Sequence, residues 1–338
     1  MAVYTRNPRY AGKVLPGEVV RRLAPVDDPL KEARPLLDAI FSGSGSLLGT
    51  AWDELPFDLL VTEFSPHSQY DKLIELARDR PGLPERVACL AGSGREFHGF
   101  KGRSWAAVPG NLHLAVHLAP NRPIEGFEVA FTALAALSVV EAIDELHGLS
   151  SHPMIKWVND ILMGDAKVAG ILAYTQSRDT TVSSAVLGFG LNVEATPLIE
   201  PTPFVPTVAC LRDYLPEGAP DAQARVLQAL LLALDRNYDT LLAEGATSLV
   251  ERYRDRSMVI GEEVTICTEA SDKTLRLVDQ GRVMGLGDRL ELILDGRGAP
   301  ITGGRLIRGR MELEMEGWNS SSGATSGARP MPNDCIHA

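Results

Sequence analysis

The chain has few cysteines and no long basic or apolar run, and each scarcity excludes a class of protein. Its 338 residues include only four cysteines, which lie far apart without a CxxC pair, so reduced thiols are expected rather than disulfides or a zinc site. The net charge of −11, with no concentrated Lys/Arg run, excludes nucleic acid as an expected partner. No stretch is apolar for long enough to span a bilayer, and no basic, apolar leader opens the chain, so we predict no membrane partner and a cytoplasmic location.

The residues that are present predict a globular protein of several parts. Hydrophobic residues make up 45% of the sequence, enough for at least one sizeable core, and the length suggests roughly two domains. Four parts follow from periodicity and from Gly, Ser and Pro content. They are an N-terminal appendage (1–55), a mixed strand and helix domain (56–255), short Gly-punctuated β segments that would close a small barrel (256–312), and a disordered tail (313–338).

The central part has an α+β pattern. The stretch NLHLAVHLA alternates strictly, which predicts a half-buried strand, and residues 126–148 predict a helix that is apolar over most of its circumference and packs against a sheet. Three β-rich runs follow, MIKWVNDILM, KVAGILAYTQ and SSAVLGFGLNV, and predict consecutive antiparallel strands. Residues 220–256 predict a long helix and a shorter one, with a break at Gly245. We therefore expect a mixed or antiparallel sheet flanked by helices.

The most informative stretch is KWVNDILMGDAKVAGIL. A lysine inside an apolar β run, Lys156, needs an anionic partner because a buried ammonium loses its hydration. Asn159 and Asp160 follow where the strand ends, Lys167 comes after a tight turn, and Gly170 allows close backbone approach. Two ammonium groups, a carboxylate and an amide on one hairpin suit a phosphate with its metal ion. The alternative is a surface hairpin whose lysines extend into solvent.

This stretch resembles the catalytic core of the biotin protein ligase family, within the biotin/lipoate ligase superfamily. GFGLNV after it, GFKGRSW and GNLHL before it, and GRVMGLGDRLELILDGRGAPITGGRLI near the end extend the resemblance over roughly residues 60–307. The resemblance implies a class II synthetase-like core and a small SH3-like C-terminal β-barrel. It also implies that ATP, with Mg²⁺, activates a small carboxylic acid, biotin first, and that the acyl group passes to a lysine of a biotinyl- or lipoyl-type carrier domain.

The resemblance also implies roles for individual residues. Lys156 matches the catalytic lysine that bridges the acid's carboxylate and the α-phosphate of ATP. Asn159 and Asp160 match the nucleotide and metal side of the motif, so Asp160 is the expected Mg²⁺ ligand. Lys167 matches a second lysine close to the acyl-adenylate. The further expected nucleotide- or acyl-binding positions are Asn111, Gly170 and Asn192.

A Gly/Arg-rich loop in this family closes over the acyl-adenylate, and only its second half is retained in this chain. The departures are Phe97, His98 and Phe100, which replace a glycine and two arginines, and Gly94, which stands where a glutamine for the biotin ring is expected. These changes bear on the identity of the acid rather than on nucleotide binding. The matching loop residues are Gly99, Lys101, Gly102, Arg103 and Trp105.

Three functions remain open from the sequence: a biotin ligase, a ligase for lipoate or octanoate, and a non-catalytic homologue that binds an adenylate or a carrier. Retention of Lys156, Asp160 and Lys167 together argues against the third, because stability alone gives no reason to keep two lysines near one pocket. A DNA-binding repressor is not expected, because residues 1–55 offer one good helix, a Gly/Ser stretch and no basic recognition face.

Overall fold

The protein was analysed as a computed structural model that describes residues 1–26, 34–41, 45–79, 82–269, 274–296 and 298–311. The chain divides into two compact units, Met1–Met258 and a second that begins at Val259. The tail predicted to be disordered lies outside the described residues. None of the helices in the described ranges has the length and apolar character that crossing a bilayer requires.

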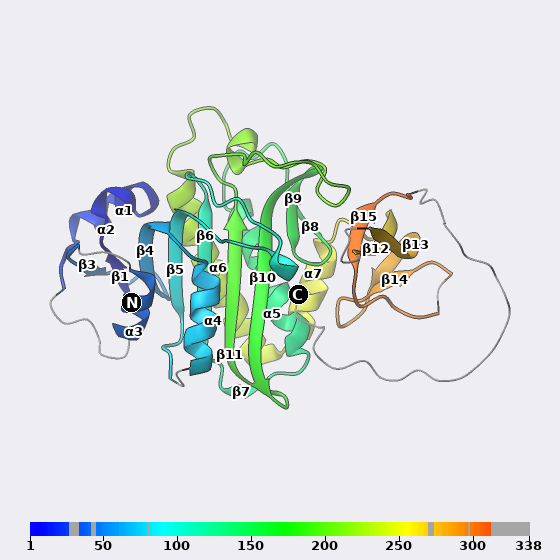
Figure 1. The fold of residues 1–338 in the computed structure, drawn as a ribbon, viewed down its shortest axis with the longest axis horizontal. Coiled ribbons are helices and arrows are strands. Elements are labelled where there is room, and N and C mark those ends of the chain that lie inside the picture. The colour runs from blue at the N-terminus through cyan, green and yellow to red at the C-terminus, as the bar shows by residue number, and fades with distance from the viewer. Residues whose placement is uncertain (27–33, 42–44, 80–81, 270–273, 297, 312–338) are drawn as a thin grey trace. The chain divides into compact units, whose positions relative to one another are not determined.

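The first unit is built on one large mixed sheet (Figure 1). Its strand order is β2-β3-β1-β4-β5-β6-β11-β10-β9-β8, and β7 pairs with β11. The pairs β1–β4 and β4–β5 are parallel and the others antiparallel, which confirms the predicted mixed sheet. The strands are β1 (Ala2–Thr5), β2 (Ala24–Pro25), β3 (Leu48–Ala51), β4 (Asp58–Ser65), β5 (Val87–Gly94), β6 (Leu112–Leu118), β7 (Arg122–Pro123), β8 (Pro153–Lys156), β9 (Asp160–Met163), β10 (Ala166–Arg178) and β11 (Thr181–Leu191).

The segment predicted as an N-terminal appendage supplies β1, β2 and β3 to this sheet. Val3 of β1 pairs with Leu59 of β4, and Val3 is fully buried. Short helices α1 (Pro8–Val14), α2 (Gly17–Arg21) and α3 (Arg34–Ile40) complete the segment. Residues 1–55 therefore belong to the same compact unit as the strands that follow.

Helices cover both faces of the sheet. In Figure 1, α4 (Gln69–Asp79) lies in front of the sheet, and α5 (Phe127–Asp144) and α6 (Ala222–Glu244) lie behind it. The predicted break at Gly245 is confirmed, since the helix α7 (Thr247–Asp255) follows it. The predicted packing of the apolar helix is also confirmed, because α5 contacts β8, β9, β10 and β11.

Two details of the strand prediction were wrong. The first of the three β-rich runs forms two strands, β8 and β9, because the chain turns after Lys156 and brings Asp160 directly opposite it. The strand β6 is buried along its whole length rather than half-buried. His113 and His117 lie on the face of β6 that α4 covers, and Leu114 and Val116 on the opposite face are buried too, so neither face meets water.

The second unit contains a small antiparallel sheet. Its strands follow the order β14-β13-β12-β15, and Leu292 also forms an isolated bridge with Ile301. Val264, Ile266 and Val283 are fully buried and form part of its core. The SH3-like barrel stays a prediction. The strands are β12 (Glu263–Glu269), β13 (Leu275–Leu286), β14 (Leu292–Leu294) and β15 (Arg305–Arg308).

Candidate functional site

A line of directly opposite residues crosses six neighbouring strands of the large sheet. Because opposite residues in a sheet project from the same face, these six side-chain positions share one face of the sheet. Helix α4 packs on another part of that face, against β5, β6 and β11. Two of the positions are glycines, which leaves the middle of the line without side chains. We call this set the cross-strand row, and it consists of Ala91, His113, Gly190, Gly170, Asp160 and Lys156.

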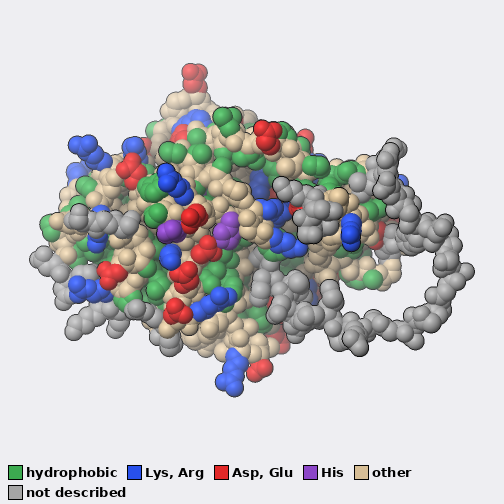
Figure 2. Space-filling model, viewed as in Figure 1, with side chains coloured by type: hydrophobic (Ala, Val, Ile, Leu, Met, Phe, Trp, Pro, Cys, Tyr) green, Lys and Arg blue, Asp and Glu red, His purple; other side chains and the backbone are tan. Residues whose placement is uncertain are grey.

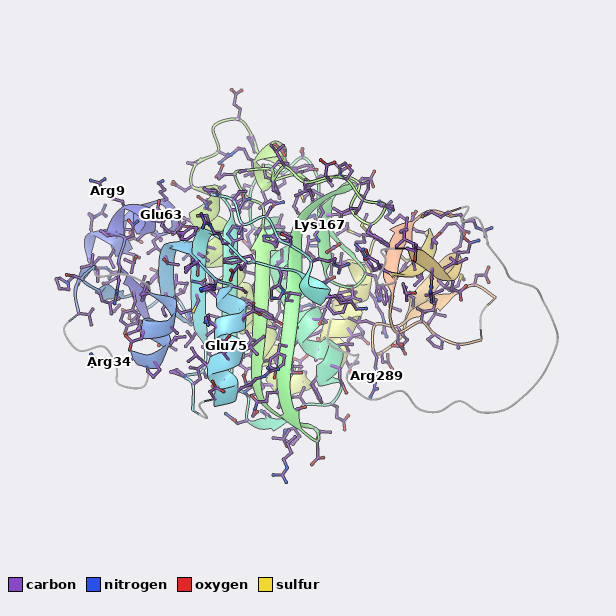
Figure 3. The ribbon with its side chains drawn as sticks, in the orientation of Figure 1. Arg9, Arg34, Glu63, Glu75, Lys167 and Arg289 are labelled. Atoms are coloured by element: carbon purple, nitrogen blue, oxygen red, sulfur yellow. The ribbon has the colours of Figure 1, made fainter. Side chains whose placement is uncertain are left out.

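The charged end of the row is formed by Lys156 and Asp160, and the second lysine predicted from the sequence, Lys167, pairs with Asp160 there. Lys156 ends β8, is only 6% exposed, and donates from Nζ to the carbonyl of Phe204. Lys167, labelled in Figure 3, forms a 2.6 Å ion pair from Nζ to Oδ1 of Asp160, and both side chains are largely buried. The structure therefore brings Lys156, Asp160 and Lys167 together, on the three consecutive strands β8, β9 and β10 rather than on the one hairpin predicted. Asn159 bonds elsewhere, since its Nδ2 donates to the Ile171 carbonyl at 2.7 Å.

A hairpin loop, residues 94–107, lies over the row and is called the covering loop here. Its two sides are joined by hydrogen bonds from Trp105 N to the Phe97 carbonyl at 2.9 Å and from Gly94 N to the Ala107 carbonyl at 3.2 Å. The indole of Trp105 lies on the glycines of the row. A Cβ at Gly190 would lie 2.3 Å from its Cε2, and a Cβ at Gly170 would lie 3.1 Å from its Cζ3. Glycine is therefore required for this contact.

Two cations of the covering loop, Lys101 and Arg103, lie close to the Phe100 ring. Nζ of Lys101 lies 5.5 Å from the centre of the Phe100 ring, and Cζ of Arg103 lies 5.8 Å from it. Arg103 also donates from Nε to the Phe100 carbonyl at 2.9 Å. Gly99 and Gly102 shape the turn at this tip, where Gly102 has a positive φ of 69°. These contacts hold Lys101 and Arg103, two of the residues that match the family loop, at the tip of the loop.

Asn111 and Asn192 lie side by side in the core, joined by a hydrogen bond of 3.4 Å. Oδ1 of Asn111 accepts from the backbone N–H groups of Val193 and Ala195 at 2.9 and 3.1 Å. The amide of Asn192 donates to the Ala209 carbonyl at 3.0 Å. Both side chains therefore form hydrogen bonds with backbone groups that follow β11 in the chain. These bonds fix that segment beside the cross-strand row.

Replacing Asn111 with alanine is expected to destabilise the fold by about 2 to 3 kcal/mol, because two buried backbone N–H groups lose their acceptor. Urea unfolding of the wild type and the variant measures this difference. An unchanged free energy of unfolding would contradict the assignment of Asn111 to this backbone network.

An ion pair between the covering loop and α4 was not predicted from the sequence. Nε2 of His98 lies 2.8 Å from Oδ2 of Asp71, and Nδ1 lies 3.1 Å from the Gly99 carbonyl. Burial alone would lower the pKa of His98, but the bond to the Gly99 carbonyl and the bond and charge of Asp71 raise it overall. Both ring nitrogens therefore donate to oxygen acceptors. The partners are 27 positions apart in sequence, which hid this contact, and an acidic residue in the first turn of α4 was the available signal.

The His98–Asp71 pair is expected to make the order of the covering loop depend on pH. Because the folded pKa of His98 is raised, its stabilisation is complete below the ordinary value of about 6.5 and is lost as pH rises through the folded value. Trypsin cleavage after the exposed Lys101, normalised to an unfolded reference peptide, should therefore accelerate with rising pH. Asp71→Asn should be cleaved rapidly throughout. Equal pH profiles for the two proteins would contradict the ion pair's role.

Charged side chains of both signs and histidines lie interspersed over this face of the molecule (Figure 2). Among the described residues, no group of three or more His, Cys, Asp and Glu side chains could hold a metal ion.

Comparison with known proteins finds relatives among the biotin protein ligases. Residues 89–192 match the Biotin/lipoate A/B protein ligase family. The chain is 30% identical over 264 residues to a biotin acetyl-CoA-carboxylase ligase of Mycobacterium tuberculosis, covering 73% of this chain and 89% of that one. It is 28% identical over 253 residues to the bifunctional ligase/repressor BirA of Bacillus subtilis, covering 72% and 73%. The structure of biotin protein ligase from Aquifex aeolicus in complex with biotin and ATP has a TM-score of 0.57 at 20% identity, covering 75% of this chain and 99% of that one, which supports the fold.

Proposed function

Because this chain belongs to the biotin protein ligase family, we propose that it uses ATP to join biotin to a lysine of a carrier protein. The reaction has two steps. A carboxylate oxygen of biotin attacks the α-phosphorus of ATP, the bond to pyrophosphate breaks, and biotinyl-AMP forms. The carrier lysine's amine then attacks the acyl carbon, AMP leaves, and an amide bond remains.

The observation that carries this proposal is the position of Lys156. Its ammonium is held on a buried strand end, opposite Asp160 and at one end of a glycine-floored row. A fixed cation of this kind stabilises negative charge that develops between a carboxylate and a phosphate in the transition state. Strand β8 and the Phe204 carbonyl hold it in place. We assign the catalytic role to Lys156.

Lys167 and Asp160 would act on the nucleotide side. Their ion pair keeps a second ammonium beside Gly170, close enough to meet an α-phosphate or an acyl-adenylate that lies over the glycines. Asp160 offers one carboxylate, which fits Mg²⁺ that arrives with ATP phosphates, because Mg²⁺ is commonly held by one or two carboxylates plus substrate oxygens. Bound in this way, the ion would neutralise charge on the departing pyrophosphate.

The covering loop would exclude water from the adenylate. Trp105 lies on the glycines and the His98–Asp71 pair ties the loop to α4, so the loop has an anchor on each side of the row. A closed, dry site protects a mixed anhydride from hydrolysis. This loop contains the three departures from the family pattern, Phe97, His98 and Phe100. They would affect how the loop closes over the site and which carboxylic acid the site accepts.

ATP–pyrophosphate exchange tests the proposed function. Purified protein, Mg²⁺ and ATP are incubated with labelled pyrophosphate and with biotin, lipoate or octanoate in turn. We expect exchange with biotin and, on adding a biotinyl-type carrier domain, a mass increase on one carrier lysine. Exchange with lipoate or octanoate alone would replace biotin as the substrate. A folded protein that binds ATP and gives no exchange with any acid would overturn the ligase proposal in favour of a non-catalytic homologue.

A further inference from the structure

Two fully buried side chains on the α4 face of the sheet carry polar atoms that are unsatisfied. Gln69 is 1% exposed, and neither Oε1 nor Nε2 has a hydrogen-bond partner in the described part of the chain. His113 is 3% exposed, and its Nε2 likewise finds no partner among the described residues. Leaving such groups unpaired in a protein core is destabilising, because they lose their hydrogen bonds to water and gain none in return. Each such group in a native fold requires an explanation, and a ligand that supplies the missing partners is one.

The topology places both residues at the same end of the cross-strand row. Leu73 of α4 packs in one apolar cluster with Cys89 of β5 and Ala115 of β6. Gln69 lies one helical turn before Leu73 and shares its helix face. The next positions on the same face of β5 and β6 are Ala91 and His113, which pair directly. Gln69 therefore lies over the end of the row that His113 occupies.

The hydrogen bond of His113 defines what its free nitrogen can do. Nδ1 lies 3.2 Å from the Ala91 carbonyl, and a carbonyl can only accept, so the proton resides on Nδ1. Burial lowers the pKa of His113 to about 4, with the Ala91 bond opposing the shift, so the imidazole is neutral near pH 7. Nε2 is consequently a hydrogen-bond acceptor. The Gln69 amide adds one acceptor oxygen and one donor nitrogen.

We propose that Gln69 and His113 recognise the cyclic urea of biotin, an inference that rests on the proposed function. A cyclic urea carries two N–H donors and one carbonyl acceptor. His113 Nε2 and Gln69 Oε1 would accept from the two N–H groups, and Gln69 Nε2 would donate to the carbonyl. The alkyl tail of octanoate and the dithiolane of lipoate offer no N–H donor, so these acids would leave the buried acceptors unpaired.

The rest of the row fits an acid that is bound with its urea at His113 and its carboxylate toward Asp160 and Lys156. From His113 on β6 to Asp160 on β9 is three strand spacings, about 14 Å, and only Gly190 and Gly170 lie between. An alkyl chain on this glycine floor would carry the carboxylate from the urea site toward the lysines. Trp105 covers the floor in this structure and would move to admit the chain.

Phe97 closes the urea end of the row. Its ring packs edge to face against His113, with the ring centres 5.5 Å apart. The same ring occupies the space beside Gly94, where a Cβ would lie 2.2 Å from its Cε2. Position 94 therefore has no room for a ligand-binding side chain in this arrangement. Gln69 and His113 supply the polar groups instead, from α4 and β6.

The test uses Gln69→Met and His113→Phe, which keep the approximate shape and remove the polar atoms. The KM values for biotin and dethiobiotin, which share the urea, should rise about 10- to 100-fold in ATP–pyrophosphate exchange. The KM for ATP should stay unchanged. The unliganded Gln69→Met protein should melt about 2 to 4 °C higher than wild type, because a buried unsatisfied amide is removed.

His117→Phe is the matched control. His117 lies on the same strand and face, but its nitrogens are partnered by the Pro84 carbonyl at 2.8 Å and the Ser184 hydroxyl at 3.0 Å. This variant should melt lower and keep the wild-type KM for biotin. An unchanged biotin KM with a lowered melting temperature in both test variants would overturn urea recognition and make the pair purely structural. Absence of wild-type exchange with biotin would instead overturn the proposed function, and urea recognition with it.

Discussion

Lys156→Ala is expected to reduce biotin-dependent ATP–pyrophosphate exchange by about 1,000-fold while the protein stays folded. The variant removes the cation that the strand end β8 holds beside Asp160, so charge that develops between the biotin carboxylate and the α-phosphate loses its stabilisation. Because Lys156 acts mainly in the transition state, kcat should fall far more than the KM for ATP rises. Initial exchange rates at saturating ATP and biotin measure the effect, with circular dichroism to confirm folding.

Lys101→Ala provides the control for Lys156→Ala. It removes the same charge from the exposed tip of the covering loop, where Lys101 contacts the Phe100 ring. Its exchange rate should fall far less than that of Lys156→Ala. A Lys156→Ala protein that retains exchange within ten-fold of wild type would contradict the catalytic assignment, and the role would then pass to Lys167, the other lysine beside Asp160.

Gly190→Ala is expected to lower exchange by about 100-fold, through displacement of the covering loop and obstruction of the row. The added Cβ would lie 2.3 Å from Trp105 Cε2 and 2.4 Å from its Cζ2, distances that force the indole off the sheet. The same methyl group would stand in the path between His113 and Asp160. Exchange kinetics and trypsin cleavage after Lys101 measure the two consequences separately.

A second substitution separates loop displacement from obstruction in Gly190→Ala. Trp105→Ala in the same chain relieves the clash, so the double variant should melt closer to wild type than Gly190→Ala alone. Gly285→Ala in β13 serves as a control, because a Cβ there meets no atom within 4 Å. Wild-type exchange in Gly190→Ala would contradict a substrate path over the glycines.

Local features of the fold could be predicted because they depend on local patterns. The apolar run of residues 126–148 predicts a buried helix, and α5 packs against four strands. The Gly break at 245 separates α6 from α7 as predicted. The turn after Lys156 was missed, because the apolar β-rich residues on both sides of it resemble one continuous strand.

The candidate site was predictable only in part. The Lys156 hairpin brings its charged residues together within a dozen positions of sequence, so spacing alone indicated that they converge. The His98–Asp71 pair, the Trp105 contact with Gly190, and the Asn111–Asn192 bond join residues that are distant in sequence. Such contacts depend on which strands become neighbours and in which register, and local propensity does not specify either.

The sequence by itself determined the α+β class, the helices with strong periodicity, and a short β-rich stretch that carries two lysines and a carboxylate. The tertiary structure decided that His113 is buried and neutral on a strand covered on both faces, and that Gln69 is buried on α4 at the same end of the row. Helices on both faces of the sheet remove these groups from water. A buried polar atom without a partner is costly, so it favours a ligand that can form the missing hydrogen bond. That environment exists only once strands far apart in the chain lie side by side.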